Sequence, residues 1–397
     1  MREQIQTAQR LLGVQYLEFV YENGRTYGDH TYFLPCDQAE QDRLAVQHQV
    51  FLQALKGKLT TTPVTHATRR ILDLGTGPGD WAAAMAKQYP HADVVGIDMA
   101  VWDLETTETA SGGASVMWQL DDLDVWNDRT DPDPGEIISR LSSYNPFNDP
   151  VQREAAEMEA HRKQRETQSR PQTPALSDAA TSIDLSVLEP EAQPGWNFSQ
   201  SFDLIHLRNM KGSFAYWEEV YAEIYKSLRP GGYVEVVDYE VLAPDMQYSS
   251  TSTSADSTDT KYTLPTARKL YSSLLDASFR SGRPLGLFYM HKTFLEDAGF
   301  KDVRSMTVNV PIGQWPESEE QKRIGKLFLV VMIESLEPYL LRLLTKYGDR
   351  ERKWSAEEIR ESVEKAKQEM LEPGETGEQD EKLKGWCARF VWVTGRK

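Results

Sequence analysis

The chain has 397 residues and a formal net charge of −17 at pH 7, from 61 acidic and 44 basic residues. This charge argues against a nucleic-acid partner, because surfaces that bind DNA or RNA are basic. The two cysteines, Cys36 and Cys387, have no His or Cys neighbours at ligand spacing, so the sequence predicts neither a metal site nor a disulfide framework. Without a leader pattern or an apolar run of spanning length, we expect a soluble cytoplasmic protein with no membrane partner.

Residues 1–69 are expected to form an N-terminal helical and lid segment. Helix-like patterns cover roughly Ile5 to Val20 and Ala39 to Leu55, and a loop with glycines and a proline separates them. The loop carries Tyr27 and Tyr32, which can fold over a ligand as a lid. Simple packing of these rings against the protein is an equally good interpretation.

The stretch from Ile71 to Trp81 reads Ile-Leu-Asp-Leu-Gly-Thr-Gly-Pro-Gly-Asp-Trp and predicts a buried strand, a glycine turn and a helix. The glycines let a ligand approach the backbone closely. Amides at the start of the helix favour a carboxylate or phosphate, whereas Asp73 before the turn favours a positive group. This pairing suits an amino acid, and an ordinary strand-to-helix turn is the alternative.

A second acid sharpens this interpretation. The run Asp93 to Asp98 predicts the next strand, and an acid at its end can bind ribose hydroxyls. A dinucleotide site prefers the pattern G-x-G-x-x-G, but this turn reads G-x-G-x-G and follows an acid. The spacing therefore favours S-adenosylmethionine over NAD.

The remaining pattern continues the core as alternating strands and helices, which predicts a parallel sheet. Asp121 and Asp122 follow a third strand at Ser115 to Leu120, where a carboxylate can accept from an adenine amino group; a polar turn is the alternative. Later strands are predicted at 202–207, 233–237, 301–311 and 386–394. Later helices are predicted at 216–228, 264–279, 291–298, 322–346 and 355–371.

Two stretches read as insertions, because they are poor in apolar residues and rich in Pro, Ser, Thr and charge. They cover residues 127–195, which we expect to be partly disordered, and 246–262. The chain then divides into an N-terminal segment (1–69), a cofactor-binding core (70–126 and 196–311), an insertion (127–195), and a helical cap with the final strand (312–397).

Several motifs together identify a family. They are Leu72-Asp-Leu-Gly-Thr-Gly77, Gly96-Ile-Asp98, His206-Leu-Arg-Asn-Met-Lys-Gly212 and Leu228-Arg-Pro-Gly-Gly-Tyr-Val-Glu235. In these the chain resembles the fungal LaeA-like (UMTA-type) class I S-adenosylmethionine-dependent methyltransferases. The resemblance implies an α/β fold with a seven-stranded, mostly parallel Rossmann-like sheet, a reversed final hairpin and helices on both faces.

The resemblance also implies S-adenosyl-L-methionine as the cofactor and a role in fungal secondary metabolism. The turn departs from the family pattern, because Pro78 and Asp80 replace the usual Thr and Ile residues. From the motifs and their neighbours we expect a cofactor site formed by Asp73, Gly75, Thr76, Gly77, Gly79, Asp98, Met99, Asp121, Asp122 and His206.

Methyl transfer needs no dedicated base, since alignment of nucleophile and methyl group supplies much of the catalysis. If the acceptor is a hydroxyl, His206 and His291 are the candidate bases, although packing explains either residue as well. Tyr27, Tyr32 and Arg208 are expected on the lid or substrate side. Arg208 can orient an acidic acceptor or pair with protein carboxylates.

Three functions follow from these patterns. The leading one is an enzyme that methylates an O or N of a small-molecule acceptor in secondary-metabolite biosynthesis. The second is a LaeA-like nuclear regulator that uses the insertion at 127–195 to dock a protein partner. The third is a protein that binds S-adenosylmethionine but catalyses a non-methylating step, because fold does not fix chemistry.

Overall fold

The computed structural model describes residues 19–102, 116–126, 195–242, 264–373 and 380–397. Three predictions fall outside these ranges. They are the first helix up to residue 18, the insertion at 127–194 and the low-complexity stretch at 246–262.

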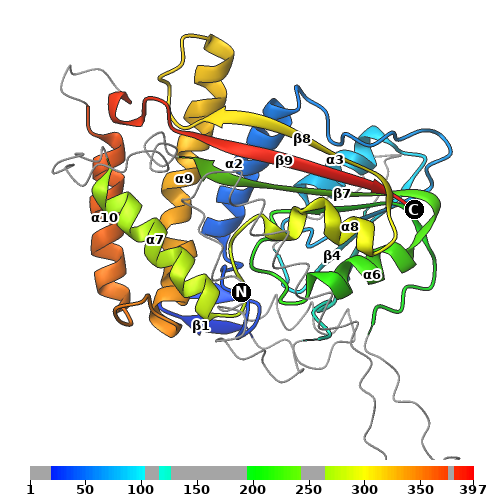
Figure 1. Ribbon diagram of the computed structural model, residues 1–397, viewed down its shortest axis with the longest axis horizontal. Helices are drawn as coiled ribbons and strands as arrows, with labels where there is room; N and C mark the ends of the chain where they lie inside the picture. The colour runs from blue at the N-terminus through cyan, green and yellow to red at the C-terminus, as the bar shows by residue number, and fades with distance from the viewer. Residues whose placement is uncertain (1–18, 103–115, 127–194, 243–263, 374–379) are drawn as a thin grey trace, which may run out of the picture.

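In the described part of the chain, one seven-stranded sheet organises the fold (Figure 1), in the order β5-β4-β3-β6-β7-β9-β8. The first five strands of that order are parallel, whereas β9 is antiparallel to both β7 and β8. The sheet and its reversed final hairpin confirm the predicted class I fold. The strands are β3 (Arg70–Leu74), β4 (Asp93–Asp98), β5 (Val116–Leu120), β6 (Phe202–Arg208), β7 (Leu228–Leu242), β8 (Lys301–Pro311) and β9 (Cys387–Arg396).

Helices cover both faces of this sheet, which is why its central strands are apolar on both sides. On one face, Leu72 and Ile205 pack against α6 (Trp217–Ser227) and α8 (Lys292–Asp297). On the other face, α3 (Asp80–Gln88) packs against Ile71, Val94 and Leu204. The central strands are therefore fully enclosed and hold the turns at their carboxyl ends in fixed positions.

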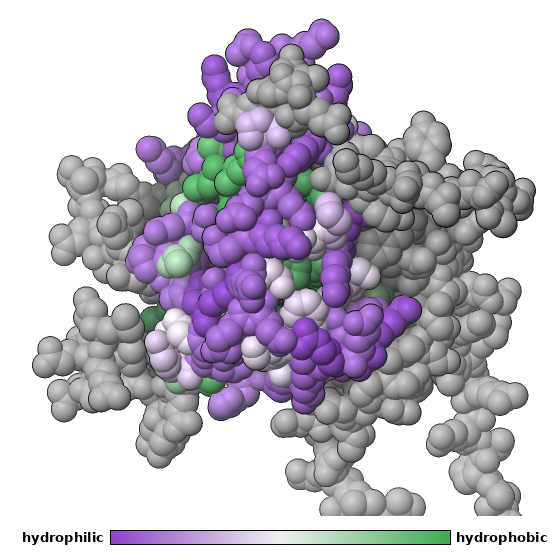
Figure 2. All heavy atoms as spheres, turned by 90° about the vertical axis from the view of Figure 1, so that its left-hand side faces the viewer, coloured by the Kyte–Doolittle hydropathy of each residue, from purple (hydrophilic) through white to green (hydrophobic). Residues whose placement is uncertain are grey.

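A helical group lies where β7 ends, on the left of Figure 1. It contains α7 (Pro265–Arg280), α9 (Glu319–Lys346) and α10 (Ala356–Leu371), which pack on one another, while α2 (Gln38–Ala54) packs on α9. The inner faces share an apolar core. Figure 2 shows the outer face on this side as largely hydrophilic, with a few hydrophobic residues visible between hydrophilic ones.

The structure corrects two details of the sequence interpretation. The segment before Pro35, predicted as a loop, contains a short hairpin of β1 (Val20–Glu22) and β2 (Arg25–Tyr27), because Asn-Gly at the turn accepts the positive φ that tight hairpins require. Strand β7 begins at Leu228 rather than Tyr233. Its early start reflects the pairing of Leu228 with Phe202 of β6, and it continues past the predicted end at Val237 because it pairs with β9 as far as Leu242.

Asp349, just after α9, connects the helices of this group. Its carboxylate accepts hydrogen bonds from the Ser273 hydroxyl of α7 and the Trp354 indole N–H, each at 2.9 Å. The backbone amides of Glu351 and Arg352 donate to its other oxygen. Burial alone would raise the pKa of Asp349, but these four donors outweigh it and hold the pKa at about 2.

We therefore expect Asp349→Asn to lower the free energy of unfolding at pH 7 by about 1–3 kcal/mol, because a buried charged acceptor is lost. A depressed pKa stabilises the fold above the unfolded-state value and loses that contribution as pH falls through the folded-state value. The deficit of the variant should thus shrink between about pH 4 and pH 2. Urea titration at each pH measures this difference in the free energy of unfolding. Asp276→Asn, which removes an ion pair with the exposed Arg350, is the control; equal stability of Asp349→Asn and the unsubstituted protein would contradict the assignment.

Candidate functional site

The glycine turn between β3 and α3 adopts the geometry that its sequence predicts. Gly75 has φ of 67° and Gly79 has φ of 85°, both in the left-handed region that favours glycine. A Cβ at Gly75 would also overlap the Met210 side chain, and one at Gly79 would overlap Trp118. Any side chain at either position would therefore displace the turn or its neighbours.

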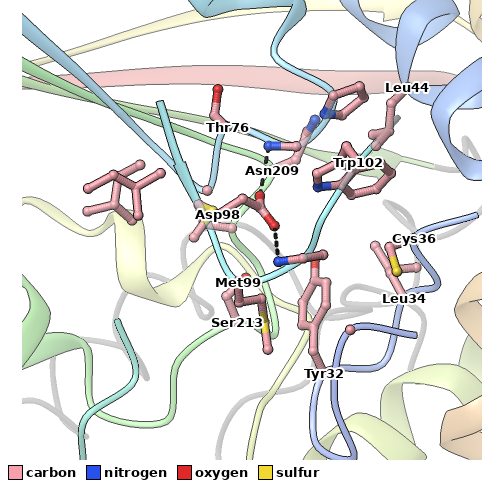
Figure 3. A pocket seen from close by; sticks show the side chains of 18 of the residues that line it. Tyr32, Leu34, Cys36, Leu44, Thr76, Asp98, Met99, Trp102, Asn209 and Ser213 are labelled. Carbon is pink, nitrogen blue, oxygen red and sulfur yellow. Dashed lines mark hydrogen bonds between the residues drawn. The ribbon is translucent and has the colours of Figure 1, made fainter. Parts of the chain in front are cut away.

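Asp98, the last residue of β4, is held against this turn. One carboxylate oxygen accepts from the Gly77 amide at 2.8 Å, and the other from the Ala100 amide at 2.9 Å. Figure 3 shows the carboxylate in the cavity wall, with Tyr32, Trp102 and Asn209 around it. Burial raises the pKa of Asp98, and the two amides act in the opposite direction. Hydroxyl donors from a ligand would further stabilise the charged form.

Asp73 and His206 lie beneath the turn. One oxygen of Asp73 accepts from the Thr76 hydroxyl at 2.7 Å, and the other lies 2.9 Å from Nδ1 of His206. The His206 ring stacks on Trp81 with centroids 3.7 Å apart. Its Nε2 is 3.9 Å from a Glu235 carboxylate oxygen. His206 is therefore a core residue that holds Asp73, and it does not line the cavity above the turn.

That cavity gathers most of the predicted site residues. It is bounded by the turn, the ends of β4, β5 and β6, the loop at 28–36, α2 and Tyr339 of α9. Among the predicted residues, its lining includes Asp73, Gly75, Thr76, Gly77, Asp98, Met99, Asp121, Asp122, Tyr32 and Arg208.

Four predicted residues lie elsewhere in the structure: Gly79, Tyr27, His206 and His291. Gly79 precedes α3 as its N-cap, and His291 is the N-cap of α8, with Nδ1 3.0 Å from the Thr293 hydroxyl. Tyr27 is fully buried, and burial raises its pKa to about 12. The structure therefore places neither His206 nor His291 in the wall of the cavity.

The loop at 28–36 is tied to α9 by Arg342, a residue with 1% exposure. Its guanidinium donates to the carbonyl oxygens of Asp29 and Tyr32, at 2.8 and 2.6 Å. It also lies 3.5 Å above the centre of the Tyr27 ring and pairs with Glu22. The loop that covers the cavity is therefore anchored from the helical side.

Arg208, at the end of β6, is a partly buried cation in the cavity wall. It donates to Nδ1 of His48 at 3.1 Å and lies 5.0 Å above the centre of the Phe51 ring. Burial, with the charge of Arg208, lowers the pKa of His48 to about 3, so the imidazole is a neutral acceptor. Within the described residues, no carboxylate forms an ion pair with Arg208 at contact distance. The carboxylates of Asp73 and Asp80 stabilise its charge from a longer range, and an anionic group on the ligand would give it a closer partner.

The opposite end of the cavity is acidic. Asp121 and Asp122 follow β5, and the pKa of Asp121 is raised by burial and by the neighbouring charge of Asp122. Asp124 forms an ion pair with Arg283. Hydrogen-bond acceptors near Asp98 suit ribose hydroxyls and an adenine amino group, and the cation at Arg208 suits an amino-acid carboxylate. The donor and acceptor pattern therefore fits S-adenosylmethionine.

Sequence reasoning gave no role to several lining residues. Glu40 and Arg43 of α2 form a buried ion pair, and Arg43 also donates to the Ser335 hydroxyl of α9 at 3.1 Å. Arg283 and Tyr339 have no local signal, because they reach the cavity from distant elements. Across the described chain, no group of three or more His, Cys, Asp or Glu side chains is arranged for a metal ion. No described helix is long and apolar enough to cross a membrane.

Comparisons with known proteins agree with this geometry. A family model described as "Methyltransferase domain" matches residues 46–280, more than half of the chain. The chain is 28% identical over 338 residues to the secondary metabolism regulator LAE1 of Cochliobolus heterostrophus, covering 82% of this chain and 81% of that protein. It is 26% identical to the protein-methionine methyltransferase laeA of Emericella nidulans, covering 89% of this chain and 72% of that protein. It is 24% identical to methyltransferase pytC of Aspergillus terreus, covering 86% of this chain and 79% of that protein.

These matches confirm the resemblance found in the sequence motifs. The chain belongs to the methyltransferase-domain family, and its cofactor is S-adenosylmethionine.

Proposed function

We propose that this enzyme methylates an oxygen or nitrogen of a small-molecule intermediate in fungal secondary metabolism. The observation that carries the proposal is the cavity above the glycine turn, bordered by the loop at 28–36 and by Tyr339 of α9. A concave site formed by several elements suits a small acceptor better than a folded protein surface. The similarity to pytC, which is named as a methyltransferase, supports methyl transfer as the reaction.

The chain's own residues give each part of the cofactor a partner. Asp98 and Asp122 are proposed to accept from the ribose hydroxyls and the adenine amino group. Arg208 and the amides of the turn are proposed to hold the carboxylate, and Asp73 with Thr76 keeps the turn in place. When bound, S-adenosylmethionine supplies an electrophilic methyl group on a sulfonium.

Catalysis is then mainly a matter of alignment, because neither His206 nor His291 lies in the cavity wall. We assign His206 as a positioning residue that acts through Asp73 on the glycine turn. Tyr32 lines the covered side of the cavity, and burial raises its pKa, so its phenol remains neutral.

A nuclear regulatory role is the second candidate function. It is favoured by the similarity to LAE1 of Cochliobolus heterostrophus, which is named as a regulator of secondary metabolism. In that case the insertion at 127–195 is proposed to dock a protein partner, whereas the enzymatic role places the protein in the cytoplasm. A methyltransferase fold that binds the cofactor without transferring the methyl group is the third.

The first prediction separates these roles. Purified protein is incubated with methyl-labelled S-adenosylmethionine and an extract of its host, and label is counted in small molecules and in protein. We expect label in small molecules, reduced at least about tenfold by Asp98→Asn at subsaturating cofactor, since a hydrogen bond to a charged group is worth about 1.5–3 kcal/mol. Asp42→Asn, on the exposed side of α2, is the matched control. Label in protein alone favours the regulator; tight binding without label favours a non-methylating role.

The second prediction concerns Arg208. Arg208→Gln should weaken binding of S-adenosylhomocysteine by about 10- to 100-fold, the range expected when a charged hydrogen bond is lost. It should leave 5′-methylthioadenosine unaffected, because this nucleoside lacks the amino-acid portion. Arg208→Lys keeps the charge and should retain part of the affinity. Calorimetry measures the affinity of each variant for both ligands. An equal loss of affinity for S-adenosylhomocysteine and 5′-methylthioadenosine in Arg208→Gln would refute the assignment of Arg208 to the carboxylate.

The third prediction tests His206 as a positioning residue. His206→Ala should lower the free energy of unfolding by about 1–3 kcal/mol, because the buried Asp73 loses a partner. It should also weaken S-adenosylhomocysteine binding while leaving the pH dependence of kcat unchanged. His291→Ala should keep the affinity and lose only the contribution of a helix cap, about 1 kcal/mol. If His206→Ala binds normally but loses one limb of the kcat–pH profile, His206 is the base instead.

A further inference from the structure

A second cavity lies beside the cofactor cavity, between the end of β7 and the helices α7, α9 and α10. Its wall is mostly aliphatic. The side chains that enclose it include Leu264, Leu270, Leu274, Leu336, Leu340 and Met370. Cavities with such walls hold water poorly and bind apolar molecules, because water finds few hydrogen-bond partners in them.

The charged groups in this wall are already engaged. Nζ of Lys211 donates to Asp238 and to the carbonyl oxygen of Tyr239, both at 2.7 Å, and lies 3.7 Å from the centre of the Tyr239 ring. Glu240 forms an ion pair with Arg389, and Arg268 also has a partner. Each charged side chain that the structure describes in this wall therefore already has an interaction within the protein, which favours a neutral occupant.

Tyr339 of α9 lines both cavities. Its ring packs edge-on against Phe33, with centroids 5.3 Å apart, and lies under the guanidinium of Arg43. Burial raises the pKa of Tyr339 well above its usual value, so the hydroxyl remains protonated. A molecule that fills the apolar cavity would thus meet the cofactor cavity at a neutral phenol.

We propose that the apolar cavity binds the body of the methyl acceptor, and that the acceptor is a neutral, largely hydrocarbon or aromatic small molecule. This inference rests on the proposed function. The acceptor's hydroxyl or amine is presented at Tyr339. Its oxygen or nitrogen forms a bond to the methyl carbon, the carbon–sulfur bond breaks with its electrons on sulfur, and the acceptor's proton passes to water.

The cavity is tested with N-phenyl-1-naphthylamine, a neutral apolar dye whose fluorescence rises in apolar surroundings. Ala267 lies on the cavity side of α7, and Ser272 lies on the exposed side of the same helix. The unsubstituted protein should bind one dye molecule. Ala267→Trp should weaken binding at least about tenfold by filling the cavity, and Ser272→Trp should leave it unchanged.

A second variant guards against misfolding. Leu336→Trp fills the same cavity from α9, and a variant is counted only if it binds S-adenosylhomocysteine as the unsubstituted protein does. Absence of dye binding in the unsubstituted protein, or unchanged binding in both filled variants, would overturn the proposal. Loss in either folded variant, with the control unaffected, supports it.

The acceptor class is tested with labelled S-adenosylmethionine and host extract, divided into an organic-soluble fraction, an aqueous fraction and protein. Label in the organic fraction that Ala267→Trp removes supports the proposal; label confined to the aqueous fraction or to protein overturns it. The two proposals fail separately. If S-adenosylhomocysteine binds and the dye does not, only the assignment of the apolar cavity fails. If both bind tightly but no labelled product forms, the proposed function is refuted. The assignment of the apolar cavity is then judged from the dye measurements alone.

Discussion

The site depends on one buried carboxylate. Asp73 uses one oxygen to fix Thr76 in the glycine turn and the other to contact His206 of the neighbouring strand. Because β3 and β6 are parallel neighbours in the sheet, this contact joins the turn to the rigid core. The Gly77 amide is then in position to meet Asp98, and the cavity forms above it. A buried carboxylate left without these donors would cost several kcal/mol, so turn geometry and core packing are linked.

The molecule combines two environments within a short distance. The cofactor cavity is lined by carboxylates, backbone groups of the glycine turn and several guanidinium groups, while the neighbouring cavity is mostly apolar, with aliphatic and aromatic side chains. Both are completed by α9, whose Tyr339 borders each and whose Ser335 binds Arg43 of α2. Residues at the ends of the strands therefore line the cofactor cavity, and the helical group determines the shape and polarity of the cavity beside it. Chemistry and selectivity are thus carried by different parts of the chain.

The sequence predicted the features that depend on local pattern. Strand, glycine turn and helix follow from residues 71–81, and the acids at 98, 121 and 122 line the cavity because they lie at or just after the carboxyl ends of parallel strands. Features that depend on packing could not be predicted from the sequence. His206 faces the core because its ring stacks on Trp81, and the contact of Arg208 with His48 joins residues far apart in the chain. Tyr339 enters from a helix far along the chain, and no local signal marks it.

Arg342 has a consequence for the timing of turnover. Two backbone carbonyls of the covering loop are held by a guanidinium that is itself buried in α9. Movement of the loop alone would break both bonds and leave the guanidinium with only Glu22 and the Tyr27 ring as partners. Departure of the spent nucleoside then requires a joint displacement of the loop and the helix, which is slower than the fluctuation of a free loop. We therefore expect product release, rather than the chemical step, to limit the turnover rate of this enzyme.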